Sequence, residues 1–360
     1  MRTETHTPRN KGRFPLQRIR PGVIIRWTLM ATSVGLMVRL VRTGWSDIVE
    51  AVQMLATTKS IYVLVALVLE VAWTFSLAQV YRSALLAMGG VARKRAAVRV
   101  SMGAFTLSRI LPGGGAVGSV FAARELMALG NPGTLTVASM LISWWVSMTT
   151  LSSIVFAGVT AGVVADQVAA TYLIAPTVTL VIMIALGFGF AIAVRRPKWR
   201  IRIQATFTRV LGRNDVHESA DATGALEPAI AGLRGGRRLV IVSCWAAASW
   251  ILDAAALWVI FEAFGQRLQV GELLIGYGLA NLLQALPELT PGWLGVLETA
   301  MAVTYTAFGI PAGVAVIAVL SYRLLSYWLP VAAGLPSAIQ ILRRSGGRVP
   351  AALRTEGSPA

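Results

Sequence analysis

The sequence predicts an all-α integral membrane protein with about six transmembrane helices and two broken, re-entrant helical hairpins arranged as an inverted repeat. Composition, charge distribution and a duplicated motif support this prediction. Apolar residues make up 56% of the 360 residues and charged residues only 14%, and the mean hydropathy is +0.66. Residues 133–165 and 167–194 carry no charge, and each run exceeds the ~20 apolar residues that cross a bilayer. A soluble core of this size is therefore excluded.

Basic residues are concentrated in segments that flank the apolar runs. Lysine and arginine number seven in residues 1–26, five in 82–100, ten in 195–238 and four in 338–360, within a net charge of +17. The positive-inside rule places such segments in the cytoplasm. We therefore expect a multi-pass protein of the cell inner membrane with both termini cytoplasmic. Its basic segments should contact anionic lipid head groups rather than nucleic acid.

A motif with a Pro-Gly pair occurs twice and indicates an internal duplication. One offset of 179 residues aligns residues 107–132 with residues 286–311 without a gap. Proline and glycine at fixed spacing break helices, and a gapless match of several such positions indicates a repeat. The aligned positions are Pro112 with Pro291, Gly113 with Gly292, Gly130 with Gly309, and Pro132 with Pro311.

The first repeat is expected at about residues 23–160. A basic cytoplasmic segment, 1–22, precedes it. The first span, 23–41, is flanked by arginines whose long side chains reach the interface, and it lacks a cleavage site typical of a signal peptide. A second span at 61–81 is followed by two hairpin arms, at about 91–111 and 114–130, and a span at 133–159.

The second repeat is expected at about residues 168–338. A span at 168–194 leads into a polar cytoplasmic loop, 195–238, and a span at 239–261. The second broken hairpin follows at about 270–309. The last span, 311–338, completes a transmembrane domain over residues 23–340, and 341–360 form a basic cytoplasmic tail.

Three spans separate the two hairpins, so the hairpins are expected to enter the membrane from opposite sides. The charges agree, because Arg93-Lys94 begins the first hairpin whereas Glu272-Leu273 occupies the aligned positions in the second. Inverted repeats with broken helices are typical of transporters, whose substrate sites lie near the midplane.

Charged residues within the spans and hairpins are the candidate functional residues, since a charge inside a bilayer needs a partner or water. Arg109 aligns with Glu288, and Arg323 lies twelve residues after Pro311, about 18 Å into the membrane. We expect Arg109 and Arg323 to face an anionic head group, with Glu288 and Glu298 as counter-charges. The hairpin glycines would bring backbone N–H groups to the same anion. The simpler alternative is that these charges only neutralise one another and hold the bundle together.

Other charged positions have weaker claims to a function. Glu70 and Asp253 lie in otherwise ordinary spans, where a structural role is favoured, and Arg124-Glu125 could lie at the cytoplasmic mouth of the first hairpin. The only cysteine, Cys244, is in an apolar run, and His6 and His217 are in polar segments. No cofactor or metal site is expected, and no phosphate-binding loop is present.

The motifs resemble the lysylphosphatidylglycerol synthase transmembrane (flippase-like) family over about residues 23–340. The second motif carries most of the resemblance, and the first adds Arg109-x-x-Pro112-Gly113 with Arg124 downstream, although Ser119 stands where the family pattern has an acidic residue. The residues of the second motif are Pro287-x-x-x-Pro291-Gly292-x-x-Gly295-x-x-Glu298, then Phe308-Gly309-Ile310-Pro311 and Tyr322-Arg323-Leu324. The resemblance implies that Arg109, Pro112, Gly113, Arg124, Glu288, Pro291, Gly292, Glu298 and Arg323 line a lipid site.

The resemblance also implies translocation of phospholipids, such as aminoacylated phosphatidylglycerol, between leaflets. In two-part members a soluble aminoacyl-transferase domain makes the lipid, and no such domain is expected here, so we expect a non-enzymatic protein. One alternative is an accessory protein that presents a lipid or polyprenyl-linked substrate to a separate lipid-modifying enzyme. Another is a membrane-embedded transferase. The sequence leaves the lipid, the driving force and the oligomeric state open.

Overall fold

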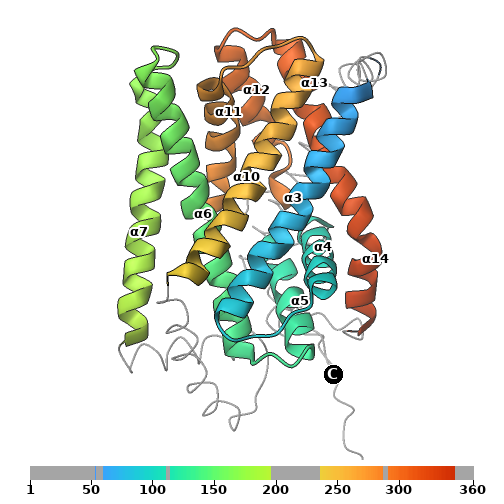
Figure 1. Cartoon of the computed structure of the whole chain (residues 1–360). Coiled ribbons are helices and arrows are strands. Elements are labelled where there is room, and N and C mark those ends of the chain that lie inside the picture. The colour runs from blue at the N-terminus through green and yellow to red at the C-terminus, as the bar shows by residue number, and fades with distance from the viewer. Residues whose placement is uncertain (1–52, 54–59, 111–113, 196–235, 287–290, 345–360) are drawn as a thin grey trace, which may run out of the picture.

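The computed structural model describes residue 53 and residues 60–110, 114–195, 236–286 and 291–344. All regular elements in these segments are helical (Figure 1). The N-terminal segment and the predicted span at 23–41 lie outside the described residues, as do most of the polar loop, 195–238, and most of the basic tail. Five described helices are long and apolar enough to cross a membrane. The predicted all-α membrane fold is therefore confirmed, and the existence of a sixth span remains a prediction.

The first half of the described chain contains two long helices with a broken hairpin between them. Helix α3 (Ser60–Ala87) precedes the hairpin arms α4 (Lys94–Ile110) and α5 (Gly114–Ala128), and α6 (Gly133–Val164) follows them. The short 3-10 helix η1 (Ala170–Leu173) and helix α7 (Ile174–Arg195) lead out of this half.

The second half repeats this order with more interruptions. Helix α10 (Arg237–Ala263) precedes a hairpin made of α11 (Val270–Leu282), the 3-10 turns η2 (Leu283–Ala285) and η3 (Pro291–Trp293), and α12 (Val296–Ala307). The last span consists of α13 (Ala312–Arg323), the π-helical turn η4 (Leu324–Trp328) and α14 (Leu329–Arg344). Under the 179-residue offset, α13 to α14 corresponds to the unbroken α6.

The aligned Gly-x-Pro sequences form the same turn in both halves. Gly130 has φ 92° and Gly309 has φ 89°, a left-handed conformation that glycine adopts without steric penalty and that commonly ends helices. Pro132 and Pro311 then stand at the N-caps of α6 and α13. The repeat seen in the sequence is thus a repeat of local conformation as well.

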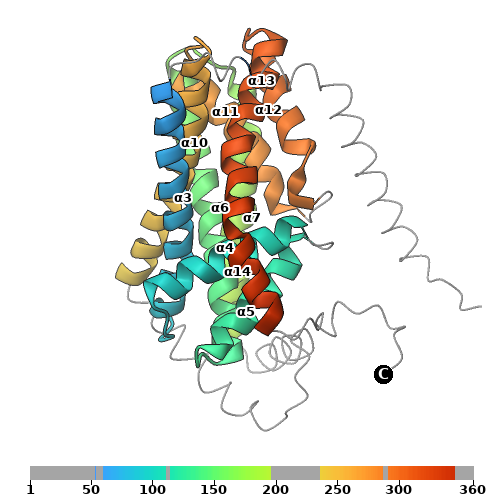
Figure 2. The same cartoon turned by 90° about the vertical axis from the view of Figure 1, so that its right-hand side faces the viewer.

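The two hairpins lie at opposite ends of the bundle. In Figures 1 and 2, α4 and α5 occupy the lower end and α11 and α12 the upper end, while α3, α6 and α10 run past both. Turn η3 packs against both α4 and α5, so the inner end of the second hairpin meets the first hairpin inside the bundle. The predicted inverted arrangement of the hairpins is confirmed.

Each hairpin packs against the last helix of the other repeat. Helix α4 contacts α14, α11 contacts α6, and α3 lies along α10. Glycine allows the close approach: a Cβ on Gly334 of α14 would lie 2.2 Å from Thr106 Oγ1 of α4, and one on Gly278 of α11 would lie 2.3 Å from Val155 Cγ2 of α6. Small residues at such contacts are typical of helices that associate in a membrane.

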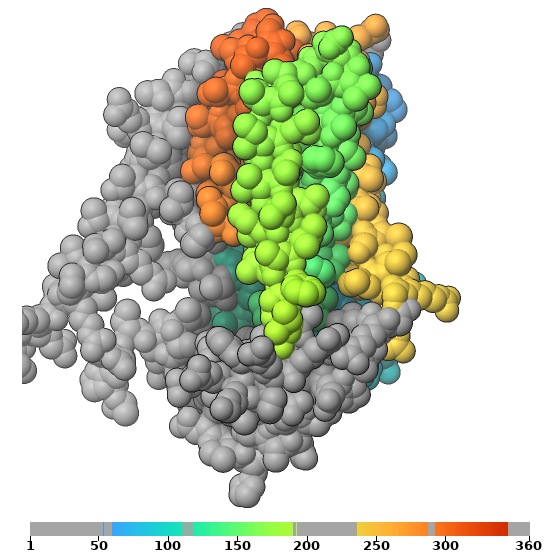
Figure 3. Space-filling view, turned by 90° about the vertical axis from the view of Figure 1, so that its left-hand side faces the viewer, coloured from blue at the N-terminus to red at the C-terminus, as the bar shows by residue number. Residues whose placement is uncertain are grey.

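Helix α7 stands at the edge of the bundle, in front in the space-filling view of Figure 3. Its apolar side chains, among them Val178, Val181 and Phe188, are exposed, as expected for a helix that faces lipid. Proline at position 176 lies in its first turn, where the missing N–H would have no helical partner in any case. Pro176 therefore does not interrupt α7.

Candidate functional site

Arg109 and Arg323 converge on one aromatic ring, that of Tyr327. The guanidinium carbon of Arg109, near the end of α4, lies 5.2 Å from the Tyr327 ring centroid and 4.8 Å from that of Phe105. The guanidinium carbon of Arg323, the last residue of α13, lies 4.7 Å from the Tyr327 centroid. Cations over aromatic rings are stabilised by the ring quadrupole, more so where water is excluded. Two cations from opposite repeats thus meet where the hairpins face each other.

Arg323 also forms an ion pair with Glu298 of α12. Its Nε donates to Glu298 Oε1 at 2.5 Å, and both side chains are largely buried. A terminal nitrogen of Arg323 donates to the backbone carbonyl of Gly292 at 3.4 Å. The arginine therefore fixes the inner end of the second hairpin to α13, which accords with the structural alternative considered for this residue.

The N-terminus of α12 is closed by its own acidic residue. The backbone N–H of Gly295, which has φ 81°, donates to Glu298 Oε2 at 2.8 Å. The sequence predicts that backbone N–H groups of the hairpin glycines face an anion, and the N–H of Gly295 donates instead to Glu298. A carboxylate at this end of a helix is favoured by the helix dipole. Glu298 therefore caps α12 with one oxygen and binds Arg323 with the other.

Gly292 allows the two arginines to come together. It has φ 63°, and a Cβ added to it would lie 2.6 Å from Tyr327 Cε2 and 2.7 Å from Arg109 Cδ. Any larger residue would displace the tyrosine or the arginine. The second Pro-Gly motif is thus part of the site's packing as well as a helix break.

The turn that carries Tyr327 is π-helical. Residues 324–328 form η4, while the aligned residues of α6 lie within a regular α-helix. Pro330 follows η4 and has no N–H to continue the α-helical ladder, which favours a change of pitch here. Single π-helical turns are frequent at functional sites. The two halves therefore differ in helix type directly after Arg323.

The other predicted site residues lie elsewhere or outside the described chain. Arg124 is half-buried in α5, and its neighbour Glu125 is buried, accepting a hydrogen bond from Arg344 at 3.4 Å. Arg99 lies 4.0 Å from Glu125. These contacts join α4, α5 and α14 at the lower end, away from Tyr327. Pro112, Gly113 and Glu288 are outside the described residues, and Pro291 begins η3.

A second polar cluster joins α3 to α10, α11 and α13. Asp253 of α10 accepts hydrogen bonds from Tyr277 to Oδ2 and from Tyr322 to Oδ1, each at 2.7 Å. Glu70 of α3 lies close enough to Asp253 to share a hydrogen bond. Both acids are buried: 1% of the surface of Glu70 and 6% of that of Asp253 is exposed.

Sequence reasoning assigned Glu70 and Asp253 to separate ordinary spans and missed this cluster. The duplication does indicate that Glu70 and Asp253 occupy similar places in the two repeats, because the position aligned with Glu70 is Ser249, one helical turn before Asp253. Residues related by an inverted repeat come close together where they lie near the symmetry axis. The packing of α3 along α10 brings the two acids together.

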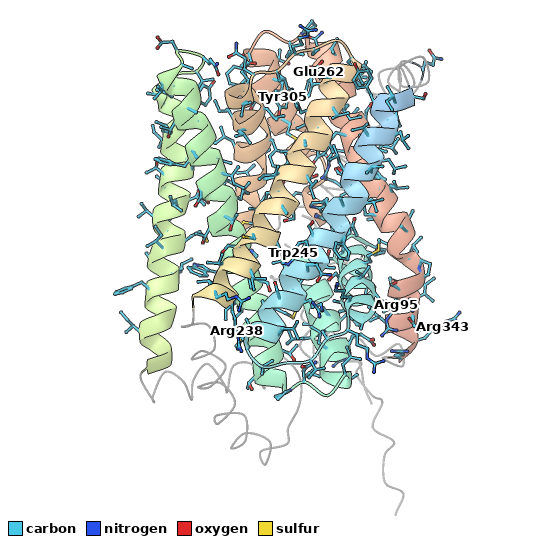
Figure 4. The ribbon with its side chains drawn as sticks, in the orientation of Figure 1. Arg95, Arg238, Trp245, Glu262, Tyr305 and Arg343 are labelled. Carbon is cyan, nitrogen blue, oxygen red and sulfur yellow. The ribbon has the colours of Figure 1, made fainter. Side chains whose placement is uncertain are left out.

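Basic residues predominate at the lower end of the bundle, whereas acidic residues outnumber basic ones at the upper end (Figure 1). Figure 4 shows Arg95, Arg238 and Arg343 at the lower end, where the first hairpin lies, and Glu262 at the upper end. The connection between α6 and α7, which contains the exposed Asp166, also lies at the upper end (Figure 1). This asymmetry of the described residues agrees with the basic segments in the sequence.

The chain is similar to membrane proteins of one family. A sequence profile described as the lysylphosphatidylglycerol synthase TM region matches residues 23–334. A UPF0104 membrane protein of Methanothermobacter thermautotrophicus is 35% identical over 86 residues, which cover 24% of this chain and 25% of the relative. A UPF0104 membrane protein of Methanocaldococcus jannaschii is 31% identical over 108 residues, covering 30% and 32%. The matched segments thus span a third or less of these relatives.

Proposed function

Because the chain belongs to the lysylphosphatidylglycerol synthase transmembrane family, we propose that it moves an anionic phospholipid between the leaflets of the cell inner membrane without changing it chemically. The observation that carries the proposal is the meeting of Arg109 and Arg323 at Tyr327, between hairpins from opposite ends of the bundle. A phosphate group between two guanidinium groups would receive charge-assisted, two-pronged hydrogen bonds, which arginine forms better than lysine.

The inverted hairpins supply a route between the leaflets. A site where two oppositely inserted hairpins meet can open toward either side when one repeat rocks against the other. The head group would stay at the arginines, while the acyl chains remain in the surrounding lipid. Glu298 would compete with the lipid phosphate for Arg323, so the bound lipid can also leave.

Translocation of a labelled lipid in proteoliposomes tests this function. The probe is phosphatidylglycerol with a fluorophore on one acyl chain, quenched by an impermeant reductant, and a zwitterionic phosphatidylcholine analogue serves as the comparison. We expect the protein to accelerate loss of protected phosphatidylglycerol fluorescence and to move phosphatidylcholine much more slowly. Equal rates with and without the protein would contradict the proposal.

Arginine-to-lysine variants test the site itself. Arg109→Lys and Arg323→Lys keep the charge but lose the planar fork, and loss of one charge-assisted hydrogen bond, ~1.5–3 kcal/mol, corresponds to about ten- to hundredfold weaker binding. Arg95→Lys, at an exposed position of the lower end, is the matched control and should translocate normally. Lipid binding without translocation would favour an accessory protein that presents the lipid to a separate enzyme. A change in the mass of the lipid would favour a transferase.

A further inference from the structure

The buried carboxyl group of Glu70 has no hydrogen-bond donor among the described side chains and backbone groups. Both of its oxygens are buried and unpartnered in the described structure, although Glu70 lies beside Asp253. A buried carboxylate without a donor is unfavourable, and removal of its solvation costs several kcal/mol. Adjacent carboxylates that share a site resolve this by holding one proton between them. That proton would serve as the donor that Glu70 lacks.

The hydrogen bonds of Asp253 suit a site with one proton and one negative charge. Its two oxygens accept from Tyr277 and Tyr322, so Asp253 is well placed to remain an acceptor. Glu70, which receives no such bond, is then the member that carries the proton toward Asp253. The tyrosine hydroxyls therefore make the two acids unequal: Asp253 accepts hydrogen bonds, and Glu70 carries the proton.

The pair joins α3 to α10, and the ionisable groups around it come from α11, α13 and α4. Asp253 is on α10, Tyr277 on α11, and Tyr322 and Arg323 on α13; Arg323 interacts electrostatically with both acids. Helix α6, which packs against α3, carries no charged residue. Helix α4, also packed against α3, brings Arg109, whose guanidinium group lies over Phe105 and Tyr327.

We propose that Glu70 and Asp253 form a proton-binding site that is coupled to the anion site at Arg323, so that binding of an anionic head group is accompanied by proton uptake. The sign follows from charge: without an anion, the cation of Arg323 keeps the proton on the pair for only part of the time, and an anion bound to Arg323 cancels that field, so that the shared proton is bound more fully. Coupling between two sites is reciprocal, so protonation of the pair also strengthens anion binding. The coupling rests on the proposed lipid site, whereas the proton site itself does not.

Infrared spectroscopy of the purified protein tests the proton site without any lipid. A protonated carboxyl group gives a carbonyl stretch that shifts when water is replaced by heavy water. We expect a buried band of this kind that is absent in Glu70→Gln and retained in the control Asp166→Asn, which changes an exposed acid. Glu70→Gln is the primary variant because it removes no described side-chain hydrogen bond of Glu70. A spectrum identical in wild type and Glu70→Gln would overturn the proposal.

Calorimetry with short-chain phosphatidylglycerol tests the coupling. Titrations in two buffers of different ionisation enthalpy report how many protons are taken up on binding. We expect uptake by the wild type and by Asp166→Asn, and none by Glu70→Gln or Asp253→Asn. Affinity should fall by up to about tenfold per pH unit as the pH rises, the limit for one linked proton.

The outcomes separate the two proposals. Lipid binding with no buffer-dependent heat, or an affinity set by sodium rather than by pH, would overturn the coupled proton. No binding of phosphatidylglycerol by the wild type would count against the lipid function and its coupling. The infrared band would still decide whether Glu70 and Asp253 hold a proton.

Discussion

Tyr322 and Arg323 are adjacent in sequence and hold two different carboxylates. Tyr322 donates to Asp253, whereas Arg323 binds Glu298. Asp253 belongs to the long helix α10, and Glu298 belongs to the second hairpin. One turn of α13 therefore connects the buried acid pair to the place where the hairpins meet, and a shift of that turn changes the contacts of both acids.

Removing the cation at position 323 should affect stability and lipid handling separately. Arg323→Ala leaves a largely buried Glu298 without its partner, which costs about 3–5 kcal/mol. The double variant Arg323→Ala with Glu298→Gln should regain most of this stability but not translocate lipid, because the cation is still missing. Thermal unfolding in detergent and translocation in proteoliposomes measure the two effects. Recovery of both by the double variant would make the arginine a structural partner only.

The contribution of the Tyr322–Asp253 hydrogen bond to stability can be tested with a matched pair of variants. Tyr322→Phe removes a hydrogen bond to the Asp253 carboxyl group, worth about 1.5–3 kcal/mol when the acceptor is charged. Tyr305→Phe, also fully buried, removes a 3.1 Å hydrogen bond to the neutral carbonyl of Leu273, worth ~0.5–1.5 kcal/mol. We expect Tyr322→Phe to lower the unfolding temperature more than Tyr305→Phe, and the reverse order would contradict this.

Gly292 should not tolerate a side chain. Gly292→Ala places a Cβ against Tyr327 and the Arg109 side chain, in a left-handed conformation that itself costs about 1–2 kcal/mol for other residues. Gly189→Ala is the control, because it lies in helix α7 with nothing within 4 Å of an added Cβ and should be neutral or stabilising. Equal thermal stability of the two variants would show that the packing around Gly292 is looser than described.

The basic end of the bundle is expected to face the cytoplasm. In a Cys244→Ser background, a cysteine at exposed position 166 should react with an impermeant maleimide in intact cells. Cysteines at exposed position 95, and at position 215 in the basic loop, should react only after the membrane is permeabilised. Labelling of position 95 or 215 in intact cells would show that the protein has the opposite orientation to the one that the positive-inside rule predicts.

Much of the fold was predictable because its main signals are local in sequence. Charge-free runs determine where spans lie: the span expected at 61–81 is helix α3, Ser60–Ala87. The duplicated Pro-Gly and Gly-x-Pro sequences determine where helices break, and the number of crossings between them gives the inversion. Some helices extend past the expected limits: α6 ends at Val164 rather than at 159, still within the charge-free run, and Asp166 follows with a φ of 55°.

The candidate site was predictable only in part. The sequence predicts Glu298 as one of two counter-charges to Arg109 and Arg323, and in the structure Glu298 is the ion-pair partner of Arg323. The adjacency of Glu70 and Asp253 depends instead on the side-by-side packing of α3 and α10, which spacing along one chain does not specify. The ring of Tyr327 was missed for another reason, since the π-helical turn that presents it has no simple sequence pattern.

The first hairpin packs against α14, which is synthesised much later, and this order affects biosynthesis. The hydrogen bond from Thr106 to the carbonyl of Val331 joins residues 225 positions apart. At about 5–20 residues per second, the ribosome needs ~10–45 s to synthesise the intervening chain. During this time the first hairpin is in or near the membrane without α14, and the polar groups of its interrupted backbone must be sheltered by water or by the insertion machinery. Truncation before α14 should therefore leave a nascent chain that the cell's membrane quality control recognises, even though most of its spans are already in place.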